Sequence, residues 1–306
     1  MFYLDPPVRL TPQIYTSVPE VLSTPRPTEW TDCNLGGKSV GTFLEGPCFD
    51  RDGRLYVVDI PFGRVFRIDA DKTWTVVAQY DGWPNGLKCT PDGRIFVADH
   101  RLGLVEVMPD TGEVVVLAGG YRGERFRGLN DLTLGTDGWV YVTDQGQSGL
   151  QEVSGCVYRW HQVSGRIERV LSNIPSPNGL VLSPDASRLF VAVTRSNTIW
   201  RAPFVPDGGV SKVGVFLNLS GGGGPDGLAV DVEGGLIVAQ PGLGVLRFDV
   251  SGILTHFVQL PKGSSISNIA FEHHESQRLW MTDSATGAIF TVDMPFSGYG
   301  AQESLI

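Results

Sequence analysis

Short apolar runs alternate with polar turn residues along the chain, in an order that repeats. Each unit starts with a polar residue, crosses a half-apolar stretch, makes an Asp-Gly or similar turn and enters a second apolar run that often ends in aspartate. The unit at 85–99 shows the whole pattern, as Asn-Gly-Leu-Lys-Cys-Thr-Pro-Asp-Gly-Arg-Ile-Phe-Val-Ala-Asp. Two short runs joined by Asp-Gly are typical of a β-hairpin. The pattern therefore predicts a chain built from repeated hairpins.

The unit occurs six times along the chain. Its first residues are Glu45, Asn85, Asn130, Asn178, Asp226 and Asn268, so successive units start 40 to 48 residues apart. Third and fourth apolar runs follow the hairpin, as at 63–68 and 74–78. A period of about 40–50 residues with four strands in each repeat is the signature of a β-propeller. The sequence predicts an all-β protein with six blades of four antiparallel strands.

The sixth unit is one strand short, because the chain ends soon after the apolar run at 289–292. The segment 1–40 can supply the missing strand, and we expect this strand within 11–24. A closed ring has no natural boundary, so residues 1–306 are expected to form a single domain with an N-terminal arm. No segment shows sustained helical periodicity, and no helix is expected.

Composition fits this picture and excludes several classes of partner. Hydrophobic residues make up 42% of the chain and charged residues 19%, as in ordinary globular proteins. The net charge of −9 argues against binding to nucleic acid or to an anionic membrane surface. No apolar run is long enough to span a bilayer, and the first residues do not resemble a signal peptide. The four cysteines form no metal-binding motif, so we expect reduced thiols and a cytoplasmic location. The oligomeric state does not follow from the sequence.

The first residues of the six units point to a metal site. The inner strand of every blade lines the central channel in the same direction, so these residues gather at one end of it. All six side chains carry oxygen, and two are carboxylates, which favours a hard divalent cation. We expect one ion, Ca²⁺ first, with Zn²⁺, Mg²⁺, Mn²⁺ and Fe²⁺ as alternatives. The competing interpretation is that Asn and Asp begin these strands only because they suit turns.

Loops that follow the second strand of each blade return to the same end of the ring. They place His100, Arg101, Gln145, Arg195 and Ser284 near the rim, and we expect His100, Arg101 and Gln145 to contact a substrate. His100 could titrate near neutral pH. The loop at 144–155 is the longest of these loops and could act as a partial lid.

Four phrases give the chain a resemblance to the SMP-30/gluconolactonase/LRE-like family over roughly 40–295. They are Glu45-Gly-Pro, Asn130-Asp131 followed by Tyr141-Val-Thr-Asp144, Pro177-Asn178-Gly179-Leu180, and Pro225-Asp226-Gly227-Leu228. The resemblance implies a six-bladed propeller that binds one divalent metal and hydrolyses sugar lactones. It implies Glu45, Asn178 and Asp226 as metal ligands and Asn130 as a contact beside the metal. Asn85 occupies the equivalent place in its own blade and is expected to be a further substrate contact.

Two positions depart from the family pattern where the substrate would be selected. Gly128 stands where sugar-lactone members related to the animal protein often carry Arg, two residues before Asn130. Gln145 stands where many bacterial and fungal relatives have proline, directly after Thr143-Asp144. Both changes lie on the substrate side of the predicted site and leave the metal ligands in place.

The leading hypothesis is metal-assisted hydrolysis of a sugar lactone or a related small cyclic ester, with Asp226 as general base and Asn130 as the second catalytic residue. Asn85 and Asn130 would orient the substrate or donate hydrogen bonds to the developing oxyanion. A second hypothesis keeps the scaffold but changes the reaction, to a biosynthetic lactone or ester, an organophosphate, or a ring-forming step. A third is a propeller without catalytic activity that serves as a platform for protein interactions.

Overall fold

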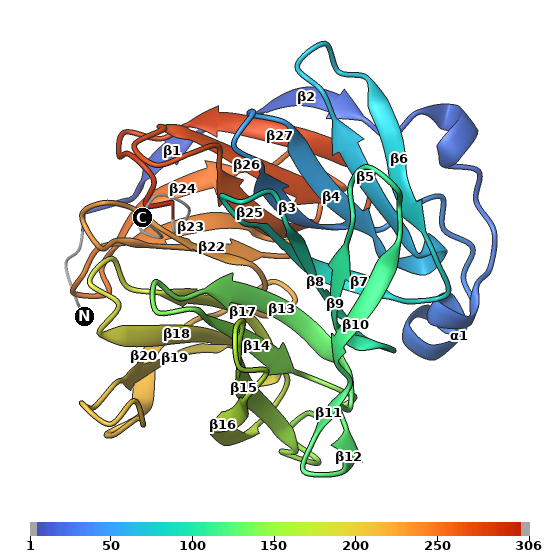
Figure 1. The fold of residues 1–306 in the computed structure, drawn as a ribbon. Coiled ribbons are helices and arrows are strands. Elements are labelled where there is room, and N and C mark those ends of the chain that lie inside the picture. Colours follow the sequence, from blue (N-terminus) through green and yellow to red (C-terminus); the bar gives the residue numbers. More distant parts are fainter. Residues whose placement is uncertain (1–4, 301–306) are drawn as a thin grey trace.

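A computed structural model describes residues 5–300, and it shows six antiparallel β-sheets arranged around a central channel (Figure 1). Each sheet has its first strand at the channel and its later strands progressively further out. Each inner strand packs against the inner strands of its neighbours, and the last packs against the first, so the ring is closed. The predicted six-bladed propeller is confirmed.

The first three blades follow the predicted repeat. Blade one consists of β3 (Leu44–Phe49), β4 (Leu55–Asp59), β5 (Arg64–Ile68) and β6 (Trp74–Gln79). Blade two consists of β7 (Pro84–Cys89), β8 (Ile95–Asp99), β9 (Gly103–Val107) and β10 (Val114–Ala118). Blade three consists of β13 (Leu129–Leu134), β14 (Trp139–Asp144), β15 (Gly155–His161) and β16 (Ile167–Ile174).

The last three blades have the same order of strands. Blade four consists of β17 (Pro177–Leu182), β18 (Arg188–Val193), β19 (Thr198–Pro203) and β20 (Gly214–Asn218). Blade five consists of β21 (Leu228–Val230), β22 (Leu236–Gln240), β23 (Gly244–Phe248) and β24 (Leu254–Gln259). Blade six takes β25 (Ile266–Phe271), β26 (Arg278–Asp283) and β27 (Ala288–Asp293) from the C-terminal part of the chain.

The N-terminal segment closes the ring, as the sequence predicted. Strand β2 (Gln13–Ser17) pairs antiparallel with β27 and becomes the outer strand of blade six. Strand β1 (Val8–Leu10) pairs parallel with β24 and adds a fifth strand to blade five, which the sequence did not predict. The N-terminal segment therefore holds blades five and six together at their outer edges.

The hydrophobic core is divided into six clusters, and each cluster fills the space between two neighbouring blades. The second strands are buried on both faces, because each blade is covered by a neighbour on either side; β4 and β8 are buried at every residue. This double burial explains why these strands are almost continuously apolar.

Aspartates at the ends of the second strands hold the approach to the inner strands. The buried carboxylate of Asp59 accepts a hydrogen bond from the Phe43 backbone N–H at 2.8 Å, just before β3. Asp144 accepts one from Gly128 at 2.8 Å before β13, and Asp283 accepts one from Ser265 at 2.9 Å before β25. These aspartates have a structural role, because they fix where β3, β13 and β25 begin along the channel axis.

A few elements lie outside the repeat. Helix α1 (Glu29–Leu35) begins at a capping box between Thr28 and Thr31 and ends at Gly36 in the left-handed conformation, so the expectation that the chain has no helix is wrong. Seven residues are too few to produce a recognisable helical period. The others are a two-stranded hairpin, β11 (Gly120–Tyr121) and β12 (Glu124–Arg125), and three 3₁₀ turns at η1 (Glu20–Leu22), η2 (Ile60–Phe62) and η3 (Thr194–Ser196). Among the described residues, no helix is long and apolar enough to cross a membrane.

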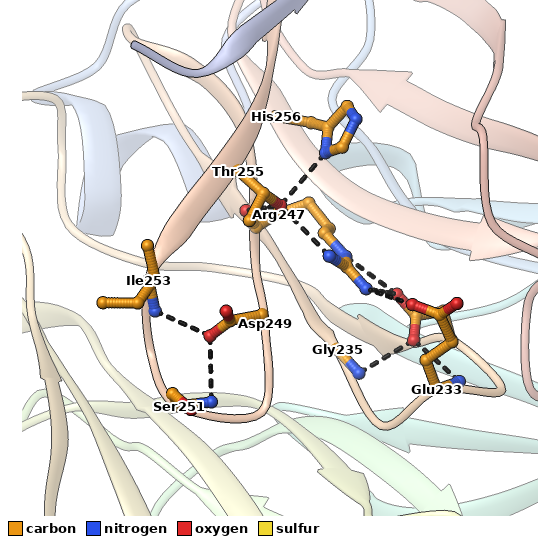
Figure 2. Close-up of polar contacts among 9 residues, drawn as sticks. Glu233, Gly235, Arg247, Asp249, Ser251, Ile253, Thr255 and His256 are labelled. Carbon is orange, nitrogen blue, oxygen red and sulfur yellow. Dashed lines mark hydrogen bonds and ion pairs between the residues drawn. The ribbon is translucent and has the colours of Figure 1, made fainter. Parts of the chain in front are cut away.

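A buried ion pair stabilises blade five (Figure 2), and its arginine also contacts the C-terminal segment. The Arg247 guanidinium in β23 binds the Asp231 carboxylate at 2.9 Å and the Thr255 hydroxyl at 3.1 Å, and it lies 3.7 Å over the Phe296 ring. Asp231 also accepts hydrogen bonds from the backbone N–H groups of Glu233 and Gly235, which closes the turn between β21 and β22. Arg247 therefore compensates the negative charge of Asp231, whose carboxylate the turn requires.

Replacing Arg247 by methionine should destabilise the protein by about 3–5 kcal/mol, because the change leaves the Asp231 carboxylate buried without its partner. The measurement is urea unfolding of the two proteins followed by tryptophan fluorescence. Arg278→Met is the matched control, since the Arg278–Asp293 pair is more than half exposed and should cost about 0–1 kcal/mol. Equal losses in the two variants would contradict this role of Arg247.

Candidate active site

Strand pairing fixes which residues occupy the same position in each blade. In each inner strand, one residue pairs with the last residue of the second strand; these residues include Leu44, Leu129, Pro177 and Ile266. The residue that follows it along the inner strand is the first in its blade to face the channel mouth. These next residues are Glu45, Asn85, Asn130, Asn178, Asp226 and Ser267. The sequence interpretation placed Asn268 in this set, but the pairing of Asn268 with Thr282 puts it one position later.

The position directly after the channel-mouth residue carries the second feature of the site. Four blades have glycine there, whereas blade three has Asp131 and blade six has Asn268. A Cβ added at Gly86 would stand 2.3 Å from Asp131 Oδ1, and one added at Gly227 would stand 2.2 Å from Asn268 Oδ1. Glycine in blades two and five thus makes room for polar side chains from blades three and six.

A β-bulge at this point explains how consecutive residues reach one site. The register of the inner strand shifts in blades one, two, three, four and six between the channel-mouth residue and the strand that follows. A bulge bends the strand and breaks the strict alternation of side chains between its two faces. Asn130 and Asp131 are both buried as a result. Sequence reasoning missed Asp131 as a site residue, although its departure from the glycine of four other blades was a signal.

Three buried carboxylates influence one another at the channel mouth. Burial raises the pKa of Glu45 to about 7, and the charge of Asp131 adds to the rise. Burial raises the pKa of Asp226 well above its usual value, with further contributions from the charges of Glu45 and Asp131. Hydrogen bonding from Asn178 opposes the rise in the pKa of Asp226. Asp226 therefore interacts with both Glu45 and Asn178, and these three residues are the ones predicted as metal ligands.

The donor set fits a hard divalent cation. Burying three carboxylates together is unfavourable unless a positive charge compensates them. Within 5–300, no three acidic, histidine or cysteine side chains are close enough to hold an ion by themselves, so carboxamide oxygens must complete the ligand set. The buried Oδ1 of Asn130 accepts no hydrogen bond from any described residue, which leaves one such oxygen available. Carboxylate and carboxamide oxygens suit Ca²⁺ or Mg²⁺ better than metals that prefer thiolates.

Hydrogen bonds fix Asn130 and Gln145 to the next blade. The Asn130 side-chain amide donates to Gln145 Oε1 at 3.2 Å, and Gln145 Nε2 donates to the Ser176 hydroxyl at 2.9 Å. The Ser176 backbone N–H in turn donates to the Ser148 hydroxyl at 3.1 Å. This bond uses one of the two amide N–H groups of Asn130, and its Oδ1 stays available as an acceptor.

A cleft of about 440 Å³ opens beside these residues. It is lined by α1, the loop after β14, Ser176 and η3, through the residues Asn34, Gln145, Gly146, Gln147, Ser148, Gly149, Leu150, Gln151, Ser176 and Arg195. The loop predicted as a partial lid therefore forms a wall of the cleft. Asn34 in α1, which no repeat signal could have revealed, contacts Gln147 of that loop at 3.5 Å.

His100 and Arg101 lie at the rim but are not among the residues that line this cleft. The His100 ring is stacked on Trp83 with centroids 5.7 Å apart, and burial lowers its pKa. A Cβ at Gly128 would stand 2.2 Å from the His100 ring, so the histidine occupies the space that an arginine at 128 would need. The Arg101 guanidinium is paired with Glu29 at 3.2 Å and with Asp81 at 2.9 Å.

The ring and its buried carboxylates define a β-propeller with an acidic site at one mouth of the channel. The family model described as the SMP-30/gluconolactonase/LRE-like region matches residues 43–285, which include all six inner strands. The chain therefore belongs to this family, as its motifs predicted.

Relatives in this family are hydrolases of more than one substrate. A gluconolactonase from Zymomonas mobilis is 31% identical over 204 residues, which are 61% of this chain and 57% of that protein. Diisopropyl-fluorophosphatase from Loligo vulgaris is 29% identical over 228 residues, 65% of this chain and 72% of that protein. The solved structure of a gluconolactonase from Xanthomonas campestris has a TM-score of 0.74 at 25% identity and covers 92% of this chain and 99% of its own. These relatives are named as hydrolytic enzymes, and this chain spans little more than half the length of the Zymomonas protein.

Neutralising one carboxylate should stabilise the metal-free protein. We expect Asp226→Asn to raise the thermal midpoint in the presence of chelator, by a free energy of about 0.5–2 kcal/mol, because the site no longer holds three mutually repelling acids. The measurement is differential scanning calorimetry with and without added Ca²⁺. The wild type should gain stability from calcium, and the variant should gain little.

The exposed Asp110 provides a matched control, because Asp110→Asn removes the same charge in the turn between β9 and β10, outside the channel mouth. It should leave both the midpoint and the calcium response unchanged. A lower midpoint for Asp226→Asn in chelator would show that the carboxylates do not oppose folding.

Proposed function

We propose that the protein is a metal-dependent hydrolase that opens a small lactone. The observation that carries the proposal is the group of buried carboxylates at the channel mouth, beside a polar cleft large enough for a small ligand. The lactonases among its relatives support the reaction. A small-molecule substrate also agrees with the acidic net charge, which disfavours nucleic acid. The cytoplasmic location stays a prediction.

Glu45, Asn178 and Asp226 would hold the metal, with Ca²⁺ as the ion that the oxygen donors suit best. A divalent cation bound there supplies Lewis-acid polarisation of the lactone carbonyl. The position of Asp131 behind Gly86 favours a supporting role, in which its charge strengthens the attraction of the site for a cation.

Asp226 would accept the proton of the attacking water at a carboxylate oxygen. Its burial beside two other acids makes it a stronger base than an exposed aspartate while no cation is present. Asn130 presents a free oxygen, so it would accept a hydrogen bond from the water or from a substrate hydroxyl. Its second amide N–H would be the donor for the other role considered, donation to the oxyanion. Asn85, one blade away, would orient the substrate.

A fluorophosphate is the second candidate substrate, because one relative is named for hydrolysis of diisopropyl fluorophosphate. The same acidic centre could act on a lactone or on a fluorophosphate, since hydrolysis of either substrate needs a polarised oxygen and a positioned water. The cleft argues for the lactone, because its lining is polar with one exposed leucine, Leu150, whereas isopropyl groups require apolar walls.

The two roles predicted for inner-strand residues can be separated by mutation. Asp226→Ala should lose the bound metal and lower kcat/KM for lactones by more than about 100-fold, because a ligand and the base disappear together. Asn85→Ala should keep the metal and lower kcat/KM by about 10-fold, because only substrate orientation is lost.

The measurements are metal content of the purified proteins by plasma mass spectrometry and lactone hydrolysis before and after chelation. Wild-type protein should contain one divalent ion, lose activity with chelator and regain it with Ca²⁺. Full activity of Asp226→Ala, or wild-type activity that chelation does not lower, would overturn the proposal. Faster turnover of diisopropyl fluorophosphate than of every lactone would favour the second candidate.

A further inference from the structure

Arg195 is the one charged residue among those that line the cleft. Two other arginines near the rim, Arg101 and Arg127, are neutralised by acids at 2.9 and 3.0 Å. Arg195 makes no ion pair with any residue in the described part of the chain, and its side chain is exposed to the cleft. An unpaired guanidinium in a concave site is a binding point for a carboxylate or a phosphate.

The backbone that carries Arg195 is fixed on both sides. The backbone N–H of Thr194 donates to the Ser176 carbonyl at 3.0 Å, and its hydroxyl donates to the Pro225 carbonyl at 2.8 Å. Asn197 closes the turn through a hydrogen bond to the Thr194 carbonyl at 3.1 Å. The short 3₁₀ turn η3 is thus fastened to blades three and five, and Arg195 starts from a preorganised position.

Arg195 lies close enough to the buried acids to share a ligand with them. Its charge lowers the pKa of Asp226, and Pro225, which Thr194 holds, is the residue directly before Asp226. A small molecule can therefore reach both the acidic centre and the guanidinium. The other polar side chains of the cleft are carboxamides and hydroxyls, including Gln147, Gln151 and Ser148, which suit a ligand with several hydroxyl groups.

We propose that the substrate is a polyhydroxylated lactone carrying an anionic group, a carboxylate or a phosphate, which binds Arg195 at the end away from the reacting ester. This inference rests on the proposed lactonase function and adds the class of substrate to it. The ester faces the acidic centre, whereas the anion is kept away from the carboxylates by the distance between the two ends of the ligand.

The test compares lactones that differ in one anionic group, on wild-type protein loaded with Ca²⁺. Glucono-1,5-lactone is paired with its 6-phosphate, and galactono-1,4-lactone is paired with galactaro-1,4-lactone, which carries a carboxylate. The wild type should prefer the charged member of one pair, and the preferred pair distinguishes phosphate from carboxylate. Arg195→Gln should raise KM for the preferred charged lactone by 10- to 100-fold, as expected for loss of a charge-assisted hydrogen bond. It should change KM for the neutral lactone by less than threefold, and Arg195→Lys should retain part of the preference.

Arg188→Gln is the matched control for charge. Arg188 begins β18, the strand that leads to Arg195, so it stands on the same blade at the far end of a six-residue strand. It is exposed and should leave every KM unchanged. Equal changes for neutral and charged lactones in Arg195→Gln, or no change for either, would overturn the proposal.

A binding measurement keeps this result separate from failure of the proposed function. Galactarate and galactonate are the open forms of the second pair, and calorimetry can measure their binding without any reaction. Tighter binding of galactarate or of 6-phosphogluconate than of its singly charged partner, lost in Arg195→Gln, would support the anion site even if no lactone were hydrolysed. Lactone hydrolysis without any such difference would leave the lactonase function in place and reject the role of Arg195.

Discussion

The close approach of neighbouring inner strands at the channel mouth is the constraint on which the rest of the structure depends. A Cβ at Gly46 would stand 2.7 Å from the Asn85 carbonyl oxygen, and one at Gly179 would stand 2.3 Å from the Asp226 carbonyl oxygen. Glycine at this position therefore lets blades one, two, four and five lie directly against the blades that follow them. The residue before each glycine then faces the channel, and the apolar clusters between neighbouring blades lie further from the channel axis. A ring with wider spacing would separate the acids by water.

The acidic centre works against the stability of the ring that holds it. Glu45 and Asp131 are buried and Asp226 is partly buried. The charges of Glu45 and Asp131 raise the pKa of Asp226, and the charge of Asp131 raises the pKa of Glu45. Elsewhere the structure compensates buried charge, as it does for Asp231 with Arg247. Local uncompensated charge is characteristic of a functional site, because the surrounding core tolerates the cost and a bound ligand relieves it. The six apolar clusters supply the rigidity that keeps the acids from separating.

The repeat was predictable because a propeller reuses one hairpin, and each copy carries the same turn chemistry. The closing strand β2 was also predictable, because blade six lacked an outer strand. The position of Ser267 was not: blade six has no glycine after it, so the phrase was aligned on Asn268 by residue type. Asp131 was missed because alternation in a regular strand places neighbouring residues on opposite faces, and the bulge removes that alternation.

The cleft could be predicted only in part. Gln145 and Arg195 were expected at the rim, because the loops after the second strands return to the channel mouth, but the sequence did not show that both line one cleft. Asn34 was not expected there, since it comes from a seven-residue helix in the N-terminal segment, outside the repeat. Loops carry specificity in folds of this kind because the scaffold fixes their ends and leaves their sequences free. The repeat therefore placed several loop residues at the rim, whereas their grouping around one cleft became visible only when the loops were placed in space.

The order of side chains around the channel shows how a sixfold scaffold can hold an acidic centre. Carboxylates stand on blades one, three and five, as Glu45, Asp131 and Asp226, and carboxamides stand on blades two, four and six, as Asn85, Asn178 and Asn268. This alternation places no two acids on neighbouring blades. Asn178 lowers the pKa of Asp226, and Asn268 lowers the pKa of both Glu45 and Asp131. Negative charge is thus distributed around the channel axis rather than concentrated on one wall. A cation near the axis would be attracted by all three acids at once, while the same charges would keep an anionic substituent out of the channel and leave it to the arginine at the rim.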